Sequence, residues 1–540
     1  MRERDRPGRL PGAFLPDLTP MLRFLSVLSL LLCLGAPLCG QDLEARLDAV
    51  KEFLRYLKKE KEEAQLVEAV MTLKGNECRP AAEELFKLLK HPMAAVQNAA
   101  LAVLETYKTP STYEAWIAEL PKAKDSEFIA LVVKVLGKAK LKAAVEAIET
   151  VGSDPKATAT VKFEVARALQ SIGDAGKTPL LGTLLGDKEP QVRMAALDAV
   201  GALKVKTHGK AVTALLADGE WQVQTAAITA AGLLRPQEAV QPMIDLMRKT
   251  GRLRTECADA LFKITGLDFG VDPDRWQEQW NSLMSVSGWR IPTDEELAKK
   301  AETRKKNDAY YGKKDETNTF AGIPTTSTNV LFIIDVSGSM DDLVVEVEKF
   351  QGYRDRKRFT VVQTELLNAI DSLTPNTNFD ILAFATDIHP WKKRLVPANI
   401  VNKDAAKGYV KSLKPIGGSE SQDLAASGLG GSANLEAGKT NTLKALLYAF
   451  GVDPEKPVKA VITGFDKNAI KSPLDTVYFL SDGRPSVGKL IETNEILKEV
   501  RKHNEIYRMV IHTIAIGDFT KAFLKQLADE NGGVFVDLGR

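Results

Sequence analysis

The chain has 540 residues, of which 44% are hydrophobic and 27% are charged, and its formal net charge is +2. This length exceeds a single hydrophobic core and predicts about three to four domains, while the composition is ordinary for a globular protein. The small net charge, without a block of basic residues, argues against a nucleic-acid partner.

The N-terminal segment predicts export. Residues 21–40 combine a positive Arg23, an apolar core at residues 24–34 and small residues before a cleavage point near Gly40, which is typical of a signal peptide. Residues 1–20 are either a long leader region or the result of a true start at Met21. The apolar core is shorter than the about 20 residues that span a bilayer. We therefore expect a periplasmic, cell-surface or secreted protein, with membrane contact only if the signal stays uncleaved.

Residues 43–264 form an array of helical repeats. Small and apolar residues recur at offsets 0, 4, 7 and 8, which mark one face of a helix, and the set returns after 32, 33, 31, 31 and 31 residues. The six starting positions are Val96, Phe128, Val161, Val192, Val223 and Arg254. A period of about 31 residues with two short helices per unit is typical of an α-solenoid.

This region resembles HEAT-like repeats, most clearly at V-R-M-A-A-L-D-A-V-G, residues 192–201. Asp272 followed by Pro273 then predicts a helix start, which places Trp276 and Trp280 on one face. We expect this tryptophan pair to close the end of the repeat core rather than bind a ligand. The solenoid with its cap should span residues 41–290 and act as a scaffold or a second binding surface, and residues 291–325 should be a charged linker.

From residue 326 to residue 540, strand and helix patterns alternate, which predicts an α/β domain with a mostly parallel, doubly wound sheet. The strands are expected at residues 330–334, 379–385, 391–396, 476–480, 509–516 and 534–538. The helices are expected at residues 359–373, 403–413, 442–450, 489–503 and 521–529.

Oxygen-bearing side chains follow the first buried strand. The apolar run at residues 330–334 leads directly into Asp335, Ser337 and Ser339. Open α/β sheets bind their ligands at the carboxyl ends of the strands, where these residues should lie. A carboxylate and two hydroxyls on a tight turn form a hard-oxygen set, which suits Mg²⁺, Mn²⁺ or Ca²⁺ rather than zinc.

Three motifs resemble the metal-ion-dependent adhesion site (MIDAS) of a von Willebrand factor type A (VWA) domain. They are D-V-S-G-S at residues 335–339, T-N-T at 440–442 and S-D-G at 481–483. The resemblance implies a Rossmann-like fold and a metal shell made of Asp335, Ser337, Ser339, Thr440 and Asp482. It also implies a partner protein that supplies an Asp or Glu carboxylate to the ion, and therefore an adhesion or other protein–protein interaction role. Insertions relative to this family are expected at residues 341–356, 417–438 and 451–474.

Two other functions stay open. Residues 433–440 fit the relaxed phosphate-loop pattern A-x-x-x-x-G-K-T of nucleotide-binding enzymes, although no apolar strand precedes them. The second is a passive structural scaffold whose α/β domain binds no metal. No catalytic residue is expected, because Ser337 and Ser339 have no histidine base nearby in the sequence, and His512 is expected to fill a structural role within a strand.

Overall fold

The computed structural model describes residues 35–538, apart from residues 174–178, 250, 287, 312–318, 325–326, 345–349, 351, 418–436, 457–464, 467, 483 and 518–520. Most of the predicted signal, most of the insertion at 417–438 and the first half of the possible phosphate loop lie outside the described residues. Tertiary contacts divide the chain into two units, Met1–Tyr113 and Glu114–Arg540. Among the helices of the described residues, none has both the length and the apolar character needed to cross a bilayer.

The first unit is helical. Its elements are α2 (Gly35–Leu57), α3 (Glu63–Met71), α4 (Arg79–Leu88) and α5 (Ala94–Leu104), and it ends within α6 (Pro110–Glu119). Helices α3 and α4 both pack on α5, burying Leu66, Leu85 and Ala100 completely or nearly so. The Tyr113 hydroxyl donates to the carbonyl of Leu104 at 2.7 Å, which ties the last turn of this unit to α5.

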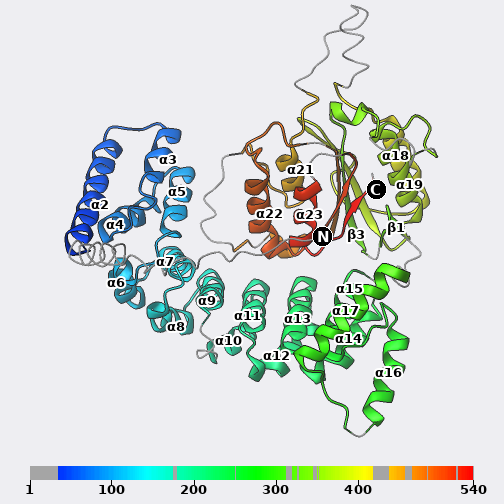
Figure 1. Cartoon of the computed structure of the whole chain (residues 1–540), viewed down its shortest axis with the longest axis horizontal. Helices are drawn as coiled ribbons and strands as arrows, with labels where there is room; N and C mark the ends of the chain where they lie inside the picture. Colours follow the sequence, from blue (N-terminus) through cyan, green and yellow to red (C-terminus); the bar gives the residue numbers. More distant parts are fainter. Residues whose placement is uncertain are drawn as a thin grey trace, which may run out of the picture. The chain divides into compact units, whose positions relative to one another are not determined.

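The second unit begins with stacked helix pairs (Figure 1). One row consists of α7 (Ser126–Lys138), α9 (Ala159–Ile172), α11 (Pro190–Ala202), α13 (Trp221–Leu234) and α15 (Leu253–Thr265). The other consists of α8 (Val145–Ser153), α10 (Pro179–Leu184), α12 (Gly209–Ala214), α14 (Val240–Met247) and α16 (Pro273–Ser285). Short 3-10 turns at Leu120–Lys122, Lys142–Ala144, Lys206–His208, Leu215–Ala217 and Gln237–Ala239 connect them. Neighbours in the first row pack directly on each other, as the repeat period predicted.

The helix start predicted at Asp272 is confirmed. The Asp272 carboxylate accepts from the amides of Asp274 and Arg275 at 3.0 and 3.2 Å, so it caps α16. Trp276 and Trp280 are both buried, and Trp276 packs edge-on against Phe269 with 4.9 Å between ring centroids. The tryptophan pair therefore fills the end of the repeat core.

The charged stretch after the cap contains a helix, α17 (Asp294–Tyr311). Arg304 of this helix pairs with Asp259 and Asp268 at 3.1 and 3.0 Å, and its guanidinium lies 4.8 Å from the ring centroid of Phe262. These contacts attach α17 to α15.

The α/β part, here called the head, is built on a seven-stranded sheet. Five strands run parallel: β3 (Asn329–Asp335), β4 (Asn378–Phe384), β7 (Thr476–Ser481), β8 (Val510–Ala515) and β9 (Phe535–Asp537). The order is β5-β4-β3-β7-β8-β9, with β5 (Ile388–Pro390) and β6 (Val396–Pro397) antiparallel to β4. A separate hairpin pairs β1 (Thr319–Phe320) with β2 (Ile323–Pro324). Strand β3 is central and buried on both faces, as predicted.

The strand predicted at residues 391–396 is wrong. The chain instead forms the two short strands β5 and β6, separated by bends. The cause lies in Asp380 of β4, whose carboxylate accepts from the amide of Lys392 at 3.0 Å. Because this side chain takes an amide that a continuous strand would pair with a backbone carbonyl, the chain leaves the sheet there.

Helices cover both faces of the sheet, as a doubly wound fold requires. Figure 1 shows α18 (Arg358–Ser372) and α19 (Ile400–Ser412) on one side, and α21 (Thr442–Tyr448), α22 (Thr493–Tyr507) and α23 (Lys521–Glu530) on the other. Side chains of α18 such as Leu366 and Ile370 share one core with Phe332 and Ile381 of the strands. Helix α22 begins at Thr493, four residues after its predicted start, and Glu492 just before it has an extended backbone.

Solenoid side chains bind the amino edge of the sheet. Gln191 and Gln222, 31 residues apart at the starts of α11 and α13, donate to the carbonyls of Asp466 and Ile470. Arg252, just before α15, donates to the carbonyls of Asp475 and Arg508 at 2.8 and 2.5 Å. Asp475 directly precedes β7, and Arg508 lies two residues before β8. The carboxyl ends of the same strands lie at the opposite edge of the sheet.

Candidate functional site

The candidate site begins at the carboxyl end of β3. Asp335 is completely buried, and one carboxylate oxygen accepts from the amide of Ser337 at 2.8 Å. The other oxygen accepts from the hydroxyl of Ser481, the last residue of β7, at 2.6 Å. Two neighbouring parallel strands therefore hold this carboxylate in one orientation.

A chain of hydrogen bonds links Asp335 to Asp482. The hydroxyls of Ser337 and Ser339 lie 3.2 Å apart, and the Ser339 hydroxyl donates to Asp482 Oδ1 at 2.9 Å. Ser339 lies in the 3-10 turn η6 (Gly338–Asp341), and Asp482 follows β7. The fold thus brings four of the five predicted shell residues together.

Close backbone packing brings the Thr440 loop to the same turn. The amide of Gly338 donates to the carbonyl of Gly438 at 3.0 Å. A Cβ atom would lie 2.8 Å from the Gly417 oxygen if placed on Gly338, and 2.2 Å from the Ile416 oxygen if placed on Gly438. Both positions therefore require glycine, because any side chain would push the three segments apart.

Thr440 itself is held by its backbone. Its amide donates to the Ser486 hydroxyl at 2.9 Å, and its carbonyl accepts from the Ser486 amide at 3.0 Å. The residue is buried, and its hydroxyl makes no hydrogen bond to any described residue. Among the described residues, the Thr440 hydroxyl therefore has no hydrogen-bond partner. It lies two residues after Gly438, whose carbonyl accepts from the turn at residues 335–339.

Burial and mutual repulsion act on the two carboxylates of the site. Burial, followed by the nearby charge of Asp482, raises the pKa of Asp335 to about 7. Burial also raises the pKa of Asp482, while Arg358 opposes that shift. Two carboxylates and three hydroxyls fit a hard divalent cation, which prefers oxygen ligands. Within the described ranges no group of three or more His, Cys, Asp or Glu side chains is arranged to hold a metal. The assignment of the five-residue shell stays a prediction.

Sequence reasoning missed three residues that shape this site: Ser481, Ser486 and Arg358. Ser481 belongs to the S-D-G motif, and its place one residue before Asp482 at the end of a strand was an available signal. Arg358, the first residue of α18, donates from Nη1 to Asp482 Oδ2 at 2.6 Å and to the carbonyl of Ser339 at 3.3 Å. Arg358 follows an insertion, and nothing in the sequence pattern indicated that its side chain would reach Asp482.

The insertion at residues 341–356 closes back on the site at both ends. The Arg358 amide donates to the carbonyl of Asp342 at 2.9 Å, and the Val344 amide donates to the carbonyl of Arg356 at 3.0 Å. Lys357 pairs with Asp341 at 2.8 Å. These bonds fix where α18 begins and therefore where Arg358 lies.

The possible phosphate loop is not supported by the backbone around Lys439. A phosphate would need free backbone amides at this loop. The amide of Lys439 donates to the Thr386 hydroxyl at 3.2 Å, and the amide of Asn441 donates to the carbonyl of Ala385 at 2.9 Å. With the Thr440 amide bound to Ser486, three successive amides are already engaged within the protein. His512 has a structural role, as predicted: its Nδ1 accepts from the Val534 amide at 3.0 Å.

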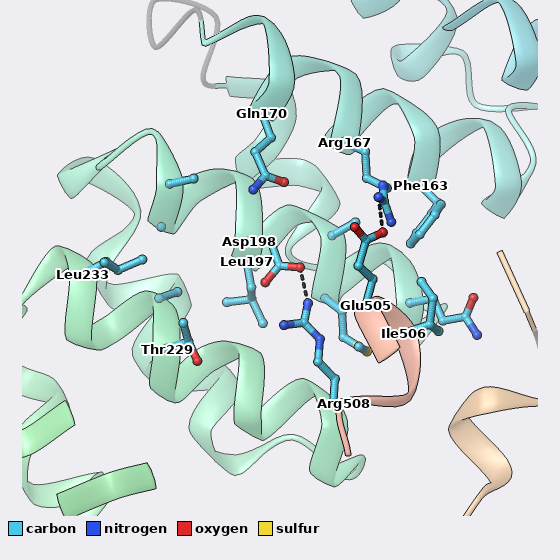
Figure 2. Close-up of a pocket in the computed structure, with 16 residues that line it drawn as sticks. Phe163, Arg167, Gln170, Leu197, Asp198, Thr229, Leu233, Glu505, Ile506 and Arg508 are labelled. Carbon is cyan, nitrogen blue, oxygen red and sulfur yellow. Dashed lines mark hydrogen bonds and ion pairs between the residues drawn. The ribbon is translucent and has the colours of Figure 1, made fainter. Parts of the chain in front are cut away.

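A cavity of about 310 Å³ lies between α9, α11 and α13 of the solenoid and the end of α22. Figure 2 shows two ion pairs facing each other across it, Arg167 with Glu505 and Asp198 with Arg508. Because these four charges already bind one another, the cavity is explained as part of the contact between solenoid and head, and we assign no ligand to it.

Comparison with known proteins gives a result for each half. The chain matches the HEAT repeats family model over residues 113–201 and 178–262, and the von Willebrand factor type A domain model over residues 328–427 and 431–537. It is 28% identical over 209 residues to inter-alpha-trypsin inhibitor heavy chain H1 of Mesocricetus auratus, which covers 38% of this chain and 18% of that protein. It is 29% identical over 218 residues to heavy chain H4 of Homo sapiens, covering 39% and 18%. The chain therefore spans less than a fifth of the length of these relatives.

Solved structures were also compared. A von Willebrand factor type A protein from Catenulispora acidiphila aligns over 40% of each chain, with 21% identity and a TM-score of 0.26. The conserved hypothetical protein BatB from Bacteroides thetaiotaomicron aligns over 39% of this chain and 90% of its own, with 12% identity and a TM-score of 0.24. The family models and the strand order described above agree on the architecture. The chain thus combines HEAT repeats with a Rossmann-like von Willebrand factor type A domain.

Proposed function

We propose that this is an exported, non-enzymatic interaction protein whose head captures a carboxylate of a partner protein through a divalent cation. The observation that carries the proposal is the hydrogen-bonded chain from Asp335 through Ser337 and Ser339 to Asp482 at the carboxyl edge of the sheet. A buried pair of carboxylates at that edge is costly unless a cation neutralises it.

Asp335, Ser337, Ser339, Thr440 and Asp482 would hold the ion, with Mg²⁺ first and Mn²⁺ or Ca²⁺ as alternatives. When bound, the ion would supply a positive centre for a carboxylate oxygen of the partner. Ser481 would orient Asp335, and Ser486 would orient the Thr440 loop. Because the shell has only two carboxylates, the ion would keep attraction for a third from outside.

The solenoid serves in this proposal as a scaffold for the head. Its contacts lie at the amino edge, through Gln191, Gln222 and Arg252, which supports a carboxyl edge that is free to meet a partner. The similarity to proteins named inter-alpha-trypsin inhibitor heavy chains is compatible with a protein partner. Export rests on the signal-like residues 21–40 and is tested by locating the protein in cell fractions.

The central experiment is calorimetry of Mg²⁺ binding to the wild-type protein and to Asp335→Ala and Asp482→Ala variants. Both substitutions should abolish binding, and both should abolish Mg²⁺-dependent capture of partners from the exported fraction. Asp371→Ala is a matched control, because Asp371 is an exposed residue of the same domain whose carboxylate pairs with Lys407 of α19 at 2.8 Å. Unchanged Mg²⁺ affinity in both site variants would contradict the proposal.

A further inference from the structure

Arg358 is a buried cation beside the proposed metal shell. Its side chain is about one-tenth exposed, and Nη1 lies 2.6 Å from Asp482 Oδ2. The same nitrogen lies 3.6 Å from Asp342 Oδ2, a carboxylate that is 55% exposed. The Arg358 amide donates to the carbonyl of Asp342 at 2.9 Å, and the guanidinium also donates to the carbonyl of Ser339 at 3.3 Å. These bonds to the turn after β3 hold the guanidinium beside Asp482.

Both oxygens of Asp482 are engaged in this arrangement. Oδ1 accepts from the Ser339 hydroxyl, and Oδ2 accepts from Arg358. A hydroxyl can rotate to offer its lone pairs to an ion. A guanidinium has only donors and stays charged at all ordinary pH values, so it can only oppose a metal ion.

The charges of the site indicate that Arg358 does more than stabilise the fold. Asp335 and Asp482 contribute two negative charges, and Arg358 cancels one of them. We propose that Arg358 is a resident counter-cation, which stabilises Asp482 when no metal is bound and lowers the affinity of the site for its divalent ion. This inference rests on the proposed function, because it concerns the regulation of the same site.

If Arg358 had only a structural role, its substitution would have different effects. A second arginine–aspartate pair in the chain, comparable to Arg358 with Asp482, provides the control. Arg193 and Asp218 of the solenoid form a second partly buried pair, joined by two hydrogen bonds of 2.8 and 2.9 Å. If Arg358 only supports the fold, Arg358→Gln and Arg193→Gln should both lower Tm and should both leave Mg²⁺ affinity unchanged.

The experiment measures Mg²⁺ affinity by calorimetry, and Tm with chelator and with Mg²⁺, for the wild type, Arg358→Gln, Arg358→Lys and Arg193→Gln. Arg358→Gln should lower Tm in chelator, enlarge the rise in Tm that Mg²⁺ produces, and tighten Mg²⁺ binding at least about tenfold, because a positive charge bonded to Asp482, one of the proposed ligands, is removed. Arg358→Lys, which keeps the charge, should retain the wild-type affinity. Arg193→Gln should lower Tm alone.

The outcomes separate this inference from the proposed function. If the wild type binds Mg²⁺ and Arg358→Gln binds equally or more weakly, the counter-cation role is overturned and the metal site stands. If only Arg358→Gln binds, the counter-cation role is supported and the native chain's use of a metal is overturned. If neither binds at millimolar Mg²⁺, both are overturned.

Discussion

The two edges of the head's sheet each hold a buried arginine, but the arginines bind different groups. At the amino edge, Arg252 donates to two backbone carbonyls and pairs with Glu256 of its own helix at 2.5 Å. At the carboxyl edge, Arg358 binds the carboxylate of Asp482. Backbone carbonyls at strand ends are fixed by the fold, whereas a carboxylate in a polar cluster can exchange one cation for another. Burial of an arginine therefore indicates function only together with the chemistry of its acceptor.

The largest expected loss of stability concerns the amino edge of the sheet, where Arg252 binds. Arg252→Gln removes the donors to Asp475 and Arg508 and leaves the Glu256 carboxylate without its partner, so it should lower the free energy of unfolding by about 3–5 kcal/mol. Stacking of the guanidinium on Trp221, 4.9 Å from the ring centroid, is lost as well. Urea denaturation measures the loss. The metal site lies at the other edge, so Mg²⁺ affinity should not change.

Arg254→Gln is the control for this substitution, because Arg254 lies two residues further on, in α15, and among the described residues its guanidinium bonds to one group, the carbonyl of Val271 at 2.9 Å. Its cost should be about 1 kcal/mol. A change in Mg²⁺ affinity on replacing Arg252 would show that the two edges are energetically coupled, and the distinction drawn between them would fail.

Asp380 is a buried carboxylate that binds backbone amides instead of an arginine, so it can be compared with Asp482. Asp380 accepts two backbone amides, yet burial raises its pKa to about 6. The folded protein therefore binds this proton more tightly than the unfolded chain does, and its stability should fall as pH rises from about 4 to about 6, by up to about 3 kcal/mol. Asp380→Asn should remove that fall. Thermal unfolding in chelator across this pH range measures it, and parallel profiles for both proteins would contradict the assignment.

The carboxyl edge should show a conflict between stability and function. Asp335→Asn removes one of two adjacent buried charges, so in chelator it should raise the free energy of unfolding by on the order of 2 kcal/mol, since one pKa unit corresponds to about 1.4 kcal/mol. The same variant should lose the stabilisation that Mg²⁺ gives the wild type. Thermal unfolding with and without Mg²⁺ tests both parts, and a destabilised variant in chelator would mean that the hydrogen bond from Ser481 outweighs the charge repulsion.

Much of the architecture was predictable because it depends on local patterns. The helix-face offsets set the repeat period, and the continuous apolar run before Asp335 indicated a strand buried on both faces. The five shell residues could be proposed because three motifs of the chain resemble those of the von Willebrand factor type A metal site. The regions where prediction failed depend on side chains that replace backbone pairing, as Asp380 does at Lys392.

The contacts between elements far apart in sequence were not predictable. Gln191 and Gln222 look like ordinary polar residues at helix starts, and their carbonyl acceptors lie about 250 residues or more away. Arg358 follows an insertion whose path decides where the guanidinium points. Only the folded chain shows that the last part of the insertion at 451–474 is bound by successive repeats.

The smallest expected effect concerns the ion pair between Arg167 and Glu505, whose side chains are 25% and 39% exposed. Each of Arg167→Glu and Glu505→Arg places like charges together, and the double substitution restores an opposite pair. A double-mutant cycle in urea should give a coupling energy of about 0.5–1 kcal/mol that shrinks at high salt. A coupling near zero would mean that this pair adds nothing to the attachment of the head. The attachment would then depend on the contacts of Gln191, Gln222 and Arg252 and on the neighbouring pair of Asp198 with Arg508.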